Sequence, residues 1–144
     1  MNKIDPNDSI ILLMHDVSLL LRKFIDRQTA EQSLTQTQWR ALVHIARHEG
    51  CNQKVLADRL EIKPISLSRL LDRLENAGWV ERRPDPNDRR AACLYLTEKA
   101  HPFLDQVKGF AFAARAQALQ GISDEDVAAF LDILRKMKTN LSRN

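Results

Sequence analysis

The chain has few of the residues that interrupt regular secondary structure. Its 144 residues include four glycines and five prolines, and 44% of them are apolar. This composition excludes a disordered or loop-dominated chain. The length corresponds to one ordinary domain, or to a compact unit that is shared across a dimer.

Signals for secretion, membrane insertion and disulfide formation are also missing. The N-terminus lacks the basic and apolar segments of a secretory signal. The most apolar stretch, residues 9–25, contains His15 and Asp16 and is too short and too polar to span a bilayer, so a buried helix is expected there. Cys51 and Cys93 have neither CxxC nor zinc-ligand spacing, and two cysteines make no disulfide framework. These absences predict a cytoplasmic protein.

Motifs of catalysis and metal binding are absent as well. The sequence has no Gly-rich phosphate loop, no G-x-S-x-G elbow and no acid pair in a recognisable context. His44 and His48 have an i, i+4 spacing that suits a metal, but Ile45 excludes the HExxH pattern and the pair lies away from the apolar face of its helix. We therefore expect no enzyme, no metal site and no cofactor.

The charges are nearly balanced, with 22 basic and 19 acidic residues and a net charge of +3. Residues 51–93 hold most of the excess, with 9 basic against 7 acidic residues. The flanking segments carry 6 against 6 (residues 1–50) and 7 against 6 (residues 94–144). A basic patch must therefore arise from the placement of these residues and not from their number.

What the sequence does contain is a helical pattern with clear boundaries. Apolar residues fill much of the helical circumference from Ile10 to Ile25, which predicts a helix buried on more than one side. Thr35 and Gln38 have capping-box spacing at the start of a second helix.

The later helices have their own boundary residues. Asn52 suits the cap of a short third helix, and Pro64 suits the first position of a fourth that runs to Gly78. Thr97 is predicted to cap a fifth helix and Ser123 a sixth. Apolar residues of the last helix recur at heptad-like spacing, at Val127, Phe130, Leu131, Leu134, Met137 and Leu141.

The helical period stops after Gly78. WVERR (residues 79–83) and AACLYLT (residues 91–97) have the pattern of strands, and the turn-forming PDPNDRR (residues 84–90) joins them. Two short helices followed by a two-stranded ribbon have the order of a winged helix-turn-helix. The predicted fold class is mainly α with a small β-wing.

The helix that begins at Pro64 has two distinct faces. Its core face spans about 100° of a helical wheel and holds Leu67, Leu70, Leu71 and Leu74. On the flank, Ser66, Arg69 and Arg73 fall within about 60° of one another. The outward surface is extended by Ile65, Ser68 and Asn76. Such a surface suits a DNA major groove, because arginine can donate two hydrogen bonds to guanine or bind phosphate.

An ordinary solvated surface is the alternative for this helix. Asp72 and Glu75 can form ion pairs with Arg69 or Arg73, and charged residues on the outer face of a helix are usually just solvated. The helix alone does not decide between the two interpretations.

The predicted ribbon favours DNA. Arg89 and Arg90 lie in its turn, where they can enter an adjacent minor groove whose negative potential favours guanidinium groups. Asp88, two residues before Arg90, can orient that arginine through a bidentate ion pair. Helix and ribbon together predict double-stranded DNA as the partner.

Three stretches of the chain resemble the MarR/SlyA family of bacterial transcriptional regulators: LTQTQW, SLSRLLDRLENAGWVERRPDPNDRRAACLYLTEKA and GISDED. The resemblance covers nearly the whole chain and includes the D-x-R signature of the wing. It implies a homodimer whose first, fifth and sixth helices form the interface, and whose winged helices each bind half of a pseudo-palindromic operator. Arg69 matches the recognition-helix arginine of the family, Asp88 its wing aspartate, and Arg89 and Arg90 its wing arginines.

The resemblance divides one integrated domain into a dimerisation helix (1–34), a winged helix-turn-helix region (35–97) and C-terminal dimerisation helices (98–144). Apolar segments far apart in the sequence can share a dimer core, which places two DNA-binding units one helical turn apart. We expect a homodimeric transcriptional regulator that acts as a repressor. The alternative is a winged-helix protein-interaction module without DNA binding, which lacks the steep salt dependence of DNA binding.

The resemblance also implies an effector. The family often binds small anionic or phenolic compounds between the dimerisation and DNA-binding regions, and in the SlyA-like branch Thr37 and Trp39 match residues of that cleft, with Arg69 nearby. This chemistry suits an aromatic carboxylate, although Trp39 lies on the apolar face of its helix and has plain core packing as the alternative. Cys51 and Cys93 lie outside the first helix, where the peroxide-sensing branch has its reactive cysteine. A structural role is therefore favoured over redox sensing.

Overall fold

The computed structural model describes residues 9–143 and is mostly helical, with one two-stranded antiparallel sheet. Its elements in chain order are α1 (Ile10–Thr29), the 3-10 helix η2 (Ala30–Gln32), α2 (Gln36–Arg47), α3 (Gln53–Leu60), α4 (Pro64–Asn76), β1 (Val80–Pro84), β2 (Ala92–Leu96), α5 (Ala100–Ala118) and α6 (Asp124–Leu141). The predicted fold class, mainly α with a small β-wing, is confirmed. Residues 1–8 and 144, which belong to the predicted dimerisation parts, lie outside the described residues.

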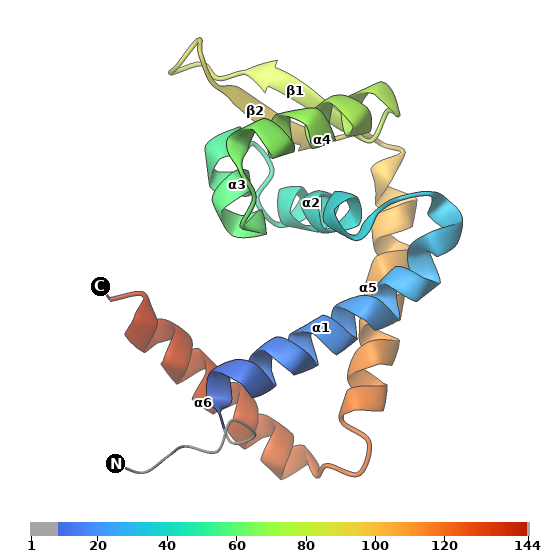
Figure 1. Cartoon of the computed structure of the whole chain (residues 1–144), viewed down its shortest axis with the longest axis vertical. Coiled ribbons are helices and arrows are strands. Elements are labelled where there is room, and N and C mark those ends of the chain that lie inside the picture. The colour runs from blue at the N-terminus through green and yellow to red at the C-terminus, as the bar shows by residue number, and fades with distance from the viewer. Residues whose placement is uncertain (1–8, 144) are drawn as a thin grey trace.

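Two regions of the molecule are distinct in Figure 1. Helices α2, α3 and α4 and the β1–β2 hairpin form a compact unit, which we call the lobe. Helices α1, α5 and α6 extend away from it, and we call them the arms. α1 packs against α5 near the base of the lobe.

Helix starts in the lobe follow the predicted caps. The amide of Gln38 donates to Thr35 Oγ1 at 3.3 Å, and the amide of Thr35 donates to Gln38 Oε1 at 2.8 Å. Asn52 Oδ1 accepts from the amide of Val55 at 2.9 Å. Pro64 occupies the first turn of α4, where its missing N–H costs no hydrogen bond. Local sequence therefore fixes the start of all three lobe helices.

The predicted cap of α5 is wrong. Helix α5 begins at Ala100, and no side chain within residues 9–143 caps it. The hydroxyl of Thr97 instead donates to the carbonyl of Gly78, which ends α4 in the left-handed region with a φ of 79°. The ammonium of Lys99 donates to the neighbouring carbonyl of Ala77 at 2.6 Å. Both side chains therefore tie the exit of β2 to the end of α4.

The hairpin is attached to the lobe along one edge. β1 and β2 pair in a register that places Val80 opposite Leu96 and Arg83 opposite Cys93. The amide of Leu94 also donates to the carbonyl of Cys51 at 2.9 Å. The segment between α2 and α3 therefore pairs with β2 through an isolated antiparallel bridge. The predicted strands are confirmed, and their base is held to the helices by backbone hydrogen bonds.

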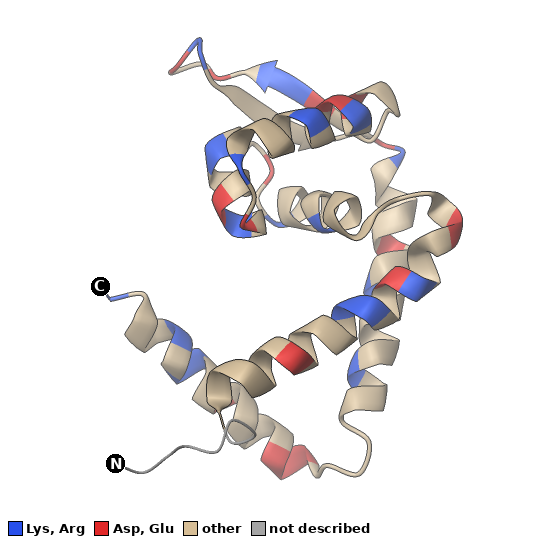
Figure 2. Ribbon diagram, viewed as in Figure 1, with Lys and Arg blue, Asp and Glu red and all other residues tan. Residues whose placement is uncertain are grey.

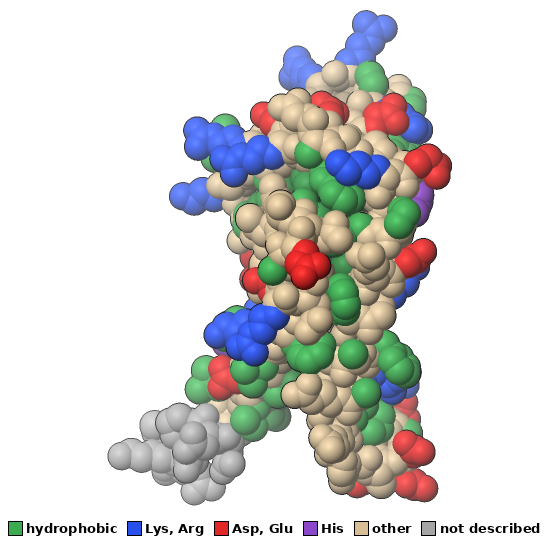
Figure 3. All heavy atoms as spheres, turned by 90° about the vertical axis from the view of Figure 1, so that its right-hand side faces the viewer, with side chains coloured by type: hydrophobic (Ala, Val, Ile, Leu, Met, Phe, Trp, Pro, Cys, Tyr) green, Lys and Arg blue, Asp and Glu red, His purple; other side chains and the backbone are tan. Residues whose placement is uncertain are grey.

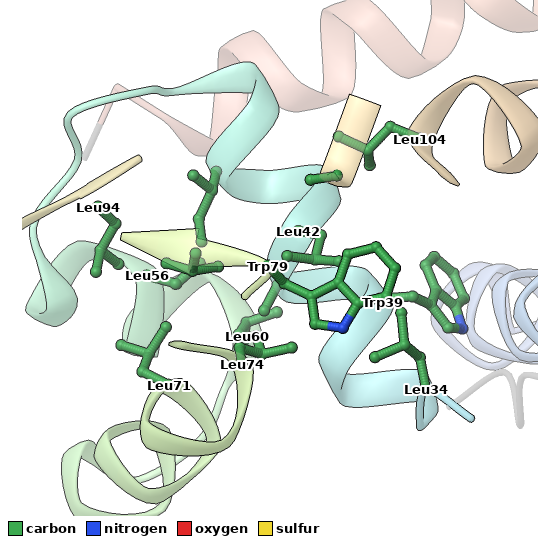
Figure 4. Packing of buried hydrophobic residues seen from close by; sticks show 14 of the residues in the cluster. Leu34, Trp39, Leu42, Leu56, Leu60, Leu71, Leu74, Trp79, Leu94 and Leu104 are labelled. Atoms are coloured by element: carbon green, nitrogen blue, oxygen red, sulfur yellow. The ribbon is translucent and has the colours of Figure 1, made fainter. Parts of the chain in front are cut away.

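The core lies inside the lobe, where side chains of α2, α3, α4, the hairpin and α5 converge (Figure 4). The largest fully buried side chains are Leu42, Ile45, Leu56, Leu67, Leu71, Leu74, Leu94, Val80 and Thr29. Of the predicted core face of α4, Leu67, Leu71 and Leu74 are buried and Leu70 is half-buried. The rings of Trp79 and Phe103 meet edge to face at 5.5 Å, which joins the hairpin to α5.

The apolar surfaces of the arms are open in the single chain. The prediction that the first helix is buried on more than one side is wrong for this chain alone, since Ile11 is 79% and Leu20 64% exposed. Phe112 on α5 and Phe130 on α6 are also exposed, and Figure 3 shows hydrophobic side chains over the arms. The sequence pattern predicted apolar faces on these helices, and the helices have them. Nothing within residues 9–143 covers those faces.

Candidate nucleic-acid interface

Helix α4 lies beside the hairpin (Figure 1) and exposes polar side chains on its outer face. Ser66, Arg69 and Arg73 are exposed on it, as predicted from the helical wheel, and Ser68 is half-buried. Ile65, at the start of the same helix, is 60% exposed, which places an apolar side chain among these polar groups. The face therefore offers two guanidinium groups, hydroxyl groups and one apolar contact to a ligand.

The acidic residues of α4 do not pair with its arginines. Arg82 Nη2 lies 2.5 Å from Asp72 Oδ1 and 3.1 Å from Glu75 Oε1. The backbone amide of Arg82 donates to Glu75 Oε2 at 3.0 Å, and the side-chain Nε of Arg82 donates to the same oxygen at 3.4 Å. The alternative in which Asp72 and Glu75 neutralise Arg69 or Arg73 is therefore not the arrangement in the structure.

Arg82 was not among the predicted site residues, although the sequence held a signal for it. In a strand, alternate side chains point to the same face. Arg82 therefore shares the inward face of β1 with buried Val80, next to α4. The hydrogen bonds between Arg82 and Glu75 lower the pKa of the Glu75 carboxyl and raise the pKa of the Arg82 guanidinium group.

The turn of the hairpin holds the predicted wing arginines. Arg89 and Arg90 are exposed, in the turn at the tip of the hairpin, which projects from the top of the lobe in Figure 2. Asp88 Oδ1 accepts from the backbone amide of Arg90 at 2.9 Å, and the amide of Ala91 donates to the Asp88 carbonyl at 3.1 Å. The predicted bidentate ion pair between Asp88 and Arg90 is not formed among residues 9–143. Asp88 shapes the backbone of the turn instead.

The charged groups of the interface differ in what they already bind. Arg83 is held by Glu81 Oε2 at 3.1 Å and stacks on the ring of Tyr95 at 4.1 Å. The guanidinium groups of Arg69, Arg73, Arg89 and Arg90 form no ion pair with a carboxylate in the part of the chain that the structure describes. Four cations on α4 and the hairpin turn are thus available to an anionic partner.

Two of the three predicted effector residues lie together. Thr37 and Arg69 line one cavity of about 330 Å³ between the start of α2 and α4, and Ser66 and Arg73 line it as well. Trp39 does not line it. Its side chain is 5% exposed in the core, and its Nε1 donates to Asp26 Oδ1 at 3.3 Å. The core alternative for Trp39 is the arrangement that the structure has.

A larger cavity of about 450 Å³ was not predicted. It lies between α2, β2 and α5, and its walls combine apolar groups with Arg47, His101 and Lys108, beside the carboxylates of Glu49 and Asp105. Its lining comes from three elements far apart in the sequence, so no local pattern marks it.

The surroundings of the cysteines and histidines bear on redox and metal chemistry. Burial raises the pKa of the Cys51 and Cys93 thiols, which disfavours the reactive thiolate. Both cysteines are free. His44 Nδ1 is buried and has no hydrogen-bond partner in the described part of the chain. No group of three or more metal-ligating side chains occurs within residues 9–143, and no helix in that span has the length and apolarity to cross a membrane.

Two consecutive helices, α3 and α4, followed by a two-stranded antiparallel hairpin define the winged helix-turn-helix class. Residues 34–92 match the model of the MarR family. The transcriptional regulator PA3341 is 31% identical, with a TM-score of 0.82 over 94% of this chain and 100% of that one. The chain belongs to the MarR family of transcriptional regulators.

Other solved structures have the same fold. A MarR-family regulator from Silicibacter pomeroyi is 25% identical, with a TM-score of 0.83 over 100% of this chain and 97% of that one. A putative MarR-family regulator from Listeria monocytogenes is 25% identical, with a TM-score of 0.80 over 92% of this chain and 89% of that one. That protein was solved in complex with 26mer DNA.

Proposed function

We propose that this protein is a homodimeric transcriptional regulator that binds a specific double-stranded DNA sequence through α4 and the hairpin turn. The observation that carries the proposal is the set of four guanidinium groups, on two adjacent elements, that no carboxylate neutralises within residues 9–143. Phosphates and base edges are the partners that such a set recognises. The Listeria monocytogenes relative solved with DNA supports the same partner.

Each part of the interface has its own role in this proposal. Arg69 and Arg73 contact base edges or phosphates in the major groove, and Ser66 and Ser68 assist them. Arg90 enters the neighbouring minor groove, and Arg89 contacts the backbone or the groove edge. Asp88 fixes the turn that carries both wing arginines.

The open faces of the arms support dimerisation. Soluble monomers rarely expose large contiguous apolar patches. A cavity of about 380 Å³ between α1, α5 and α6 has mostly apolar walls, which include Val17, Leu21 and Phe130. A second copy that covers these faces gives two DNA-binding lobes related by two-fold symmetry, which matches a pseudo-palindromic operator.

The cavity beside α4 supports regulation by a small molecule. Arg69 offers a cation, and Thr37 a hydroxyl, to an aromatic carboxylate or a phenol in a space of about 330 Å³. Because Arg69 is also proposed to contact DNA, a ligand bound there competes with the operator. The protein acts as a repressor that such a ligand releases.

The experiment that tests the proposal is binding of the purified protein to mixed genomic DNA fragments over a series of salt concentrations. Arg90→Ala is measured alongside, with Arg27→Ala as the control, because Arg27 is exposed on α1 away from the hairpin. We expect fragment-selective binding that weakens steeply with salt. Arg90→Ala should cost about 1–3 kcal/mol of binding free energy, and Arg27→Ala almost nothing.

The other outcomes are equally informative. Selective binding that survives Arg90→Ala removes the wing from the proposal but keeps the regulator. Absence of DNA binding at low salt contradicts the proposal and favours a winged-helix protein-interaction module.

A further inference from the structure

Arg82 lies between the hairpin and the helix that carries the proposed DNA contacts. Its side chain is mostly buried, with 23% of its surface exposed, whereas Asp72 and Glu75 are 54% and 39% exposed. Glu75 accepts hydrogen bonds from the Nε, the Nη2 and the backbone amide of Arg82. These three hydrogen bonds fix the orientation of the Arg82 guanidinium group, and its Nη2 also donates to Asp72.

The order of side chains around α4 explains why this contact matters. At 100° per residue, Glu75, Asp72 and Arg69 follow one another around the helix at intervals of about 60°. Asp72 is also three residues after Arg69, which is the spacing at which opposite charges on a helix surface pair. Without another partner, Asp72 has Arg69 as its nearest cation on the helix. In the structure the carboxylate binds Arg82 instead, and Arg82 also binds Glu75, which lies on the opposite side of Asp72 from Arg69 on the helical wheel.

We infer that Arg82 is a positioning residue for DNA binding, which holds Asp72 away from Arg69 and so keeps the Arg69 guanidinium available to DNA. Glu75 acts one step earlier, because it orients Arg82. Arg82 itself need not touch DNA. The inference rests on the proposed function, since it assigns Arg69 to the DNA contact, but its structural part concerns only the protein.

The first test is Arg82→Gln, measured by affinity for an operator fragment selected with the wild-type protein. We expect binding about 2- to 5-fold weaker, because Arg69 must first be freed from an exposed ion pair with Asp72, and such pairs are only weakly stable. The slope of log affinity against log salt should fall by about one phosphate contact if Arg69 binds phosphate. Arg83→Gln is the matched control. It removes the same charge from the next residue of β1, where the side chain binds Glu81 and Tyr95, and should weaken binding far less.

A second-site pair separates positioning from general electrostatics. R82Q/D72N and R82Q/E81Q both restore the wild-type net charge, but only the first removes the carboxylate that competes for Arg69. We expect R82Q/D72N to recover most of the lost affinity and R82Q/E81Q to recover little. Equal recovery in both overturns the inference, and so does recovery in neither, because Arg82 then acts through the fold or through a direct contact.

A readout without DNA keeps the two proposals apart. In Arg82→Gln, the Nε–H signal of Arg69 in an NMR spectrum should shift as Asp72 moves to it, and D72N should reverse the shift. An unchanged Arg69 signal overturns the inference even if the protein binds DNA. A shifted signal in a protein that binds no DNA supports the positioning while the proposed function fails.

Circular dichroism and thermal unfolding check that the variants fold. If Arg82→Gln does not fold, Glu75→Gln replaces it as the parent, because it leaves Arg82 in place but removes the charge that orients it. The same second-site substitutions, D72N and E81Q, are then compared in that background. Wild-type affinity for Glu75→Gln, together with an unchanged Arg69 signal, overturns the inference.

Discussion

The carboxylate of Asp88 binds the backbone amide of Arg90 at 2.9 Å, and not its guanidinium group. An aspartate that accepts a hydrogen bond from the backbone two residues later stabilises a turn. Asp88 therefore sets the path of the chain at the tip of the hairpin, while the Arg90 side chain remains exposed. This role in the backbone explains why a negatively charged residue, Asp88, lies next to the proposed DNA contact Arg90.

Asp88→Ala should weaken DNA binding although it removes a negative charge from the interface. The turn loses its hydrogen bond, so Arg90 is held less well, and we expect a loss of roughly 2- to 10-fold in affinity. Asp88→Asn keeps an oxygen acceptor for the amide and should bind DNA at least as well as the wild type. Titration of an operator fragment at fixed salt measures both. Tighter binding by Asp88→Ala would mean that charge outweighs turn geometry at this position.

Thr37→Val should separate the effector from the operator. Valine has nearly the shape of threonine without the hydroxyl, so the cavity between α2 and α4 keeps its volume and loses one hydrogen-bonding group. Calorimetric titration with benzoate, as the simplest aromatic carboxylate, should show binding that weakens by about one net hydrogen bond, or roughly 5-fold. Operator affinity should not change.

Arg69→Ala is the companion variant. Because Arg69 lines the same cavity and belongs to the proposed DNA surface, it should lose both benzoate and operator binding. Benzoate binding that survives both substitutions would place the effector elsewhere, with the larger cavity between α2, β2 and α5 as the next candidate.

Sequence patterns predicted the parts of this fold that depend on neighbouring residues. The capping box of Thr35 and Gln38 joins groups three residues apart, so the sequence carries the whole interaction. Thr97 has the residue type of a cap, but the acceptor of its hydroxyl is the carbonyl of Gly78, nineteen positions earlier. A local sequence pattern cannot predict a hydrogen bond to a residue that only the fold brings close.

The candidate site follows the same division. Exposure of Arg69 and Arg73 was predicted from the helical period, since it depends only on α4 itself. The ion pairs of Asp72 and Glu75 with Arg82 were not predicted. They join α4 to β1, and a helical wheel of α4 does not show where β1 lies. Which of these residues contact DNA stays a prediction.

Leu20→Asp should prevent dimerisation. Leu20 is 64% exposed on α1, in the apolar surface that we propose a second copy covers. A carboxylate buried there without a partner costs about 3–5 kcal/mol, and two-fold symmetry places it in both subunits. Sedimentation velocity should therefore change from a dimer to a monomer.

Ile65→Asp is the matched control for this variant. Ile65 is 60% exposed, almost as much as Leu20, but lies on α4. It should remain dimeric and lose operator affinity. Dissociation of both variants, or of neither, would contradict the assignment of the interface to the arms.

Stability should fall as the pH drops below neutrality, with His44 as one cause. Burial lowers the pKa of His44, and the nearby charges of Arg40, Arg47 and Arg59 lower it further. Its Nδ1 also lacks a hydrogen-bond partner among residues 9–143. Protonation therefore favours the unfolded chain, whose histidine has a pKa of about 6.5. The stabilisation is present above that pH and is lost as the pH falls, completely so below the folded pKa.

Chemical denaturation of wild type and His44→Gln between pH 7.5 and 5, a range of about two to three pH units around the histidine pKa, measures this effect. The wild type should lose more unfolding free energy than His44→Gln over this range, since glutamine does not titrate. His48→Gln, at the exposed end of the same helix, should retain most of the loss. Identical pH profiles for wild type and His44→Gln would assign the loss to other groups, because linkage requires that removal of the responsible proton site removes the pH dependence.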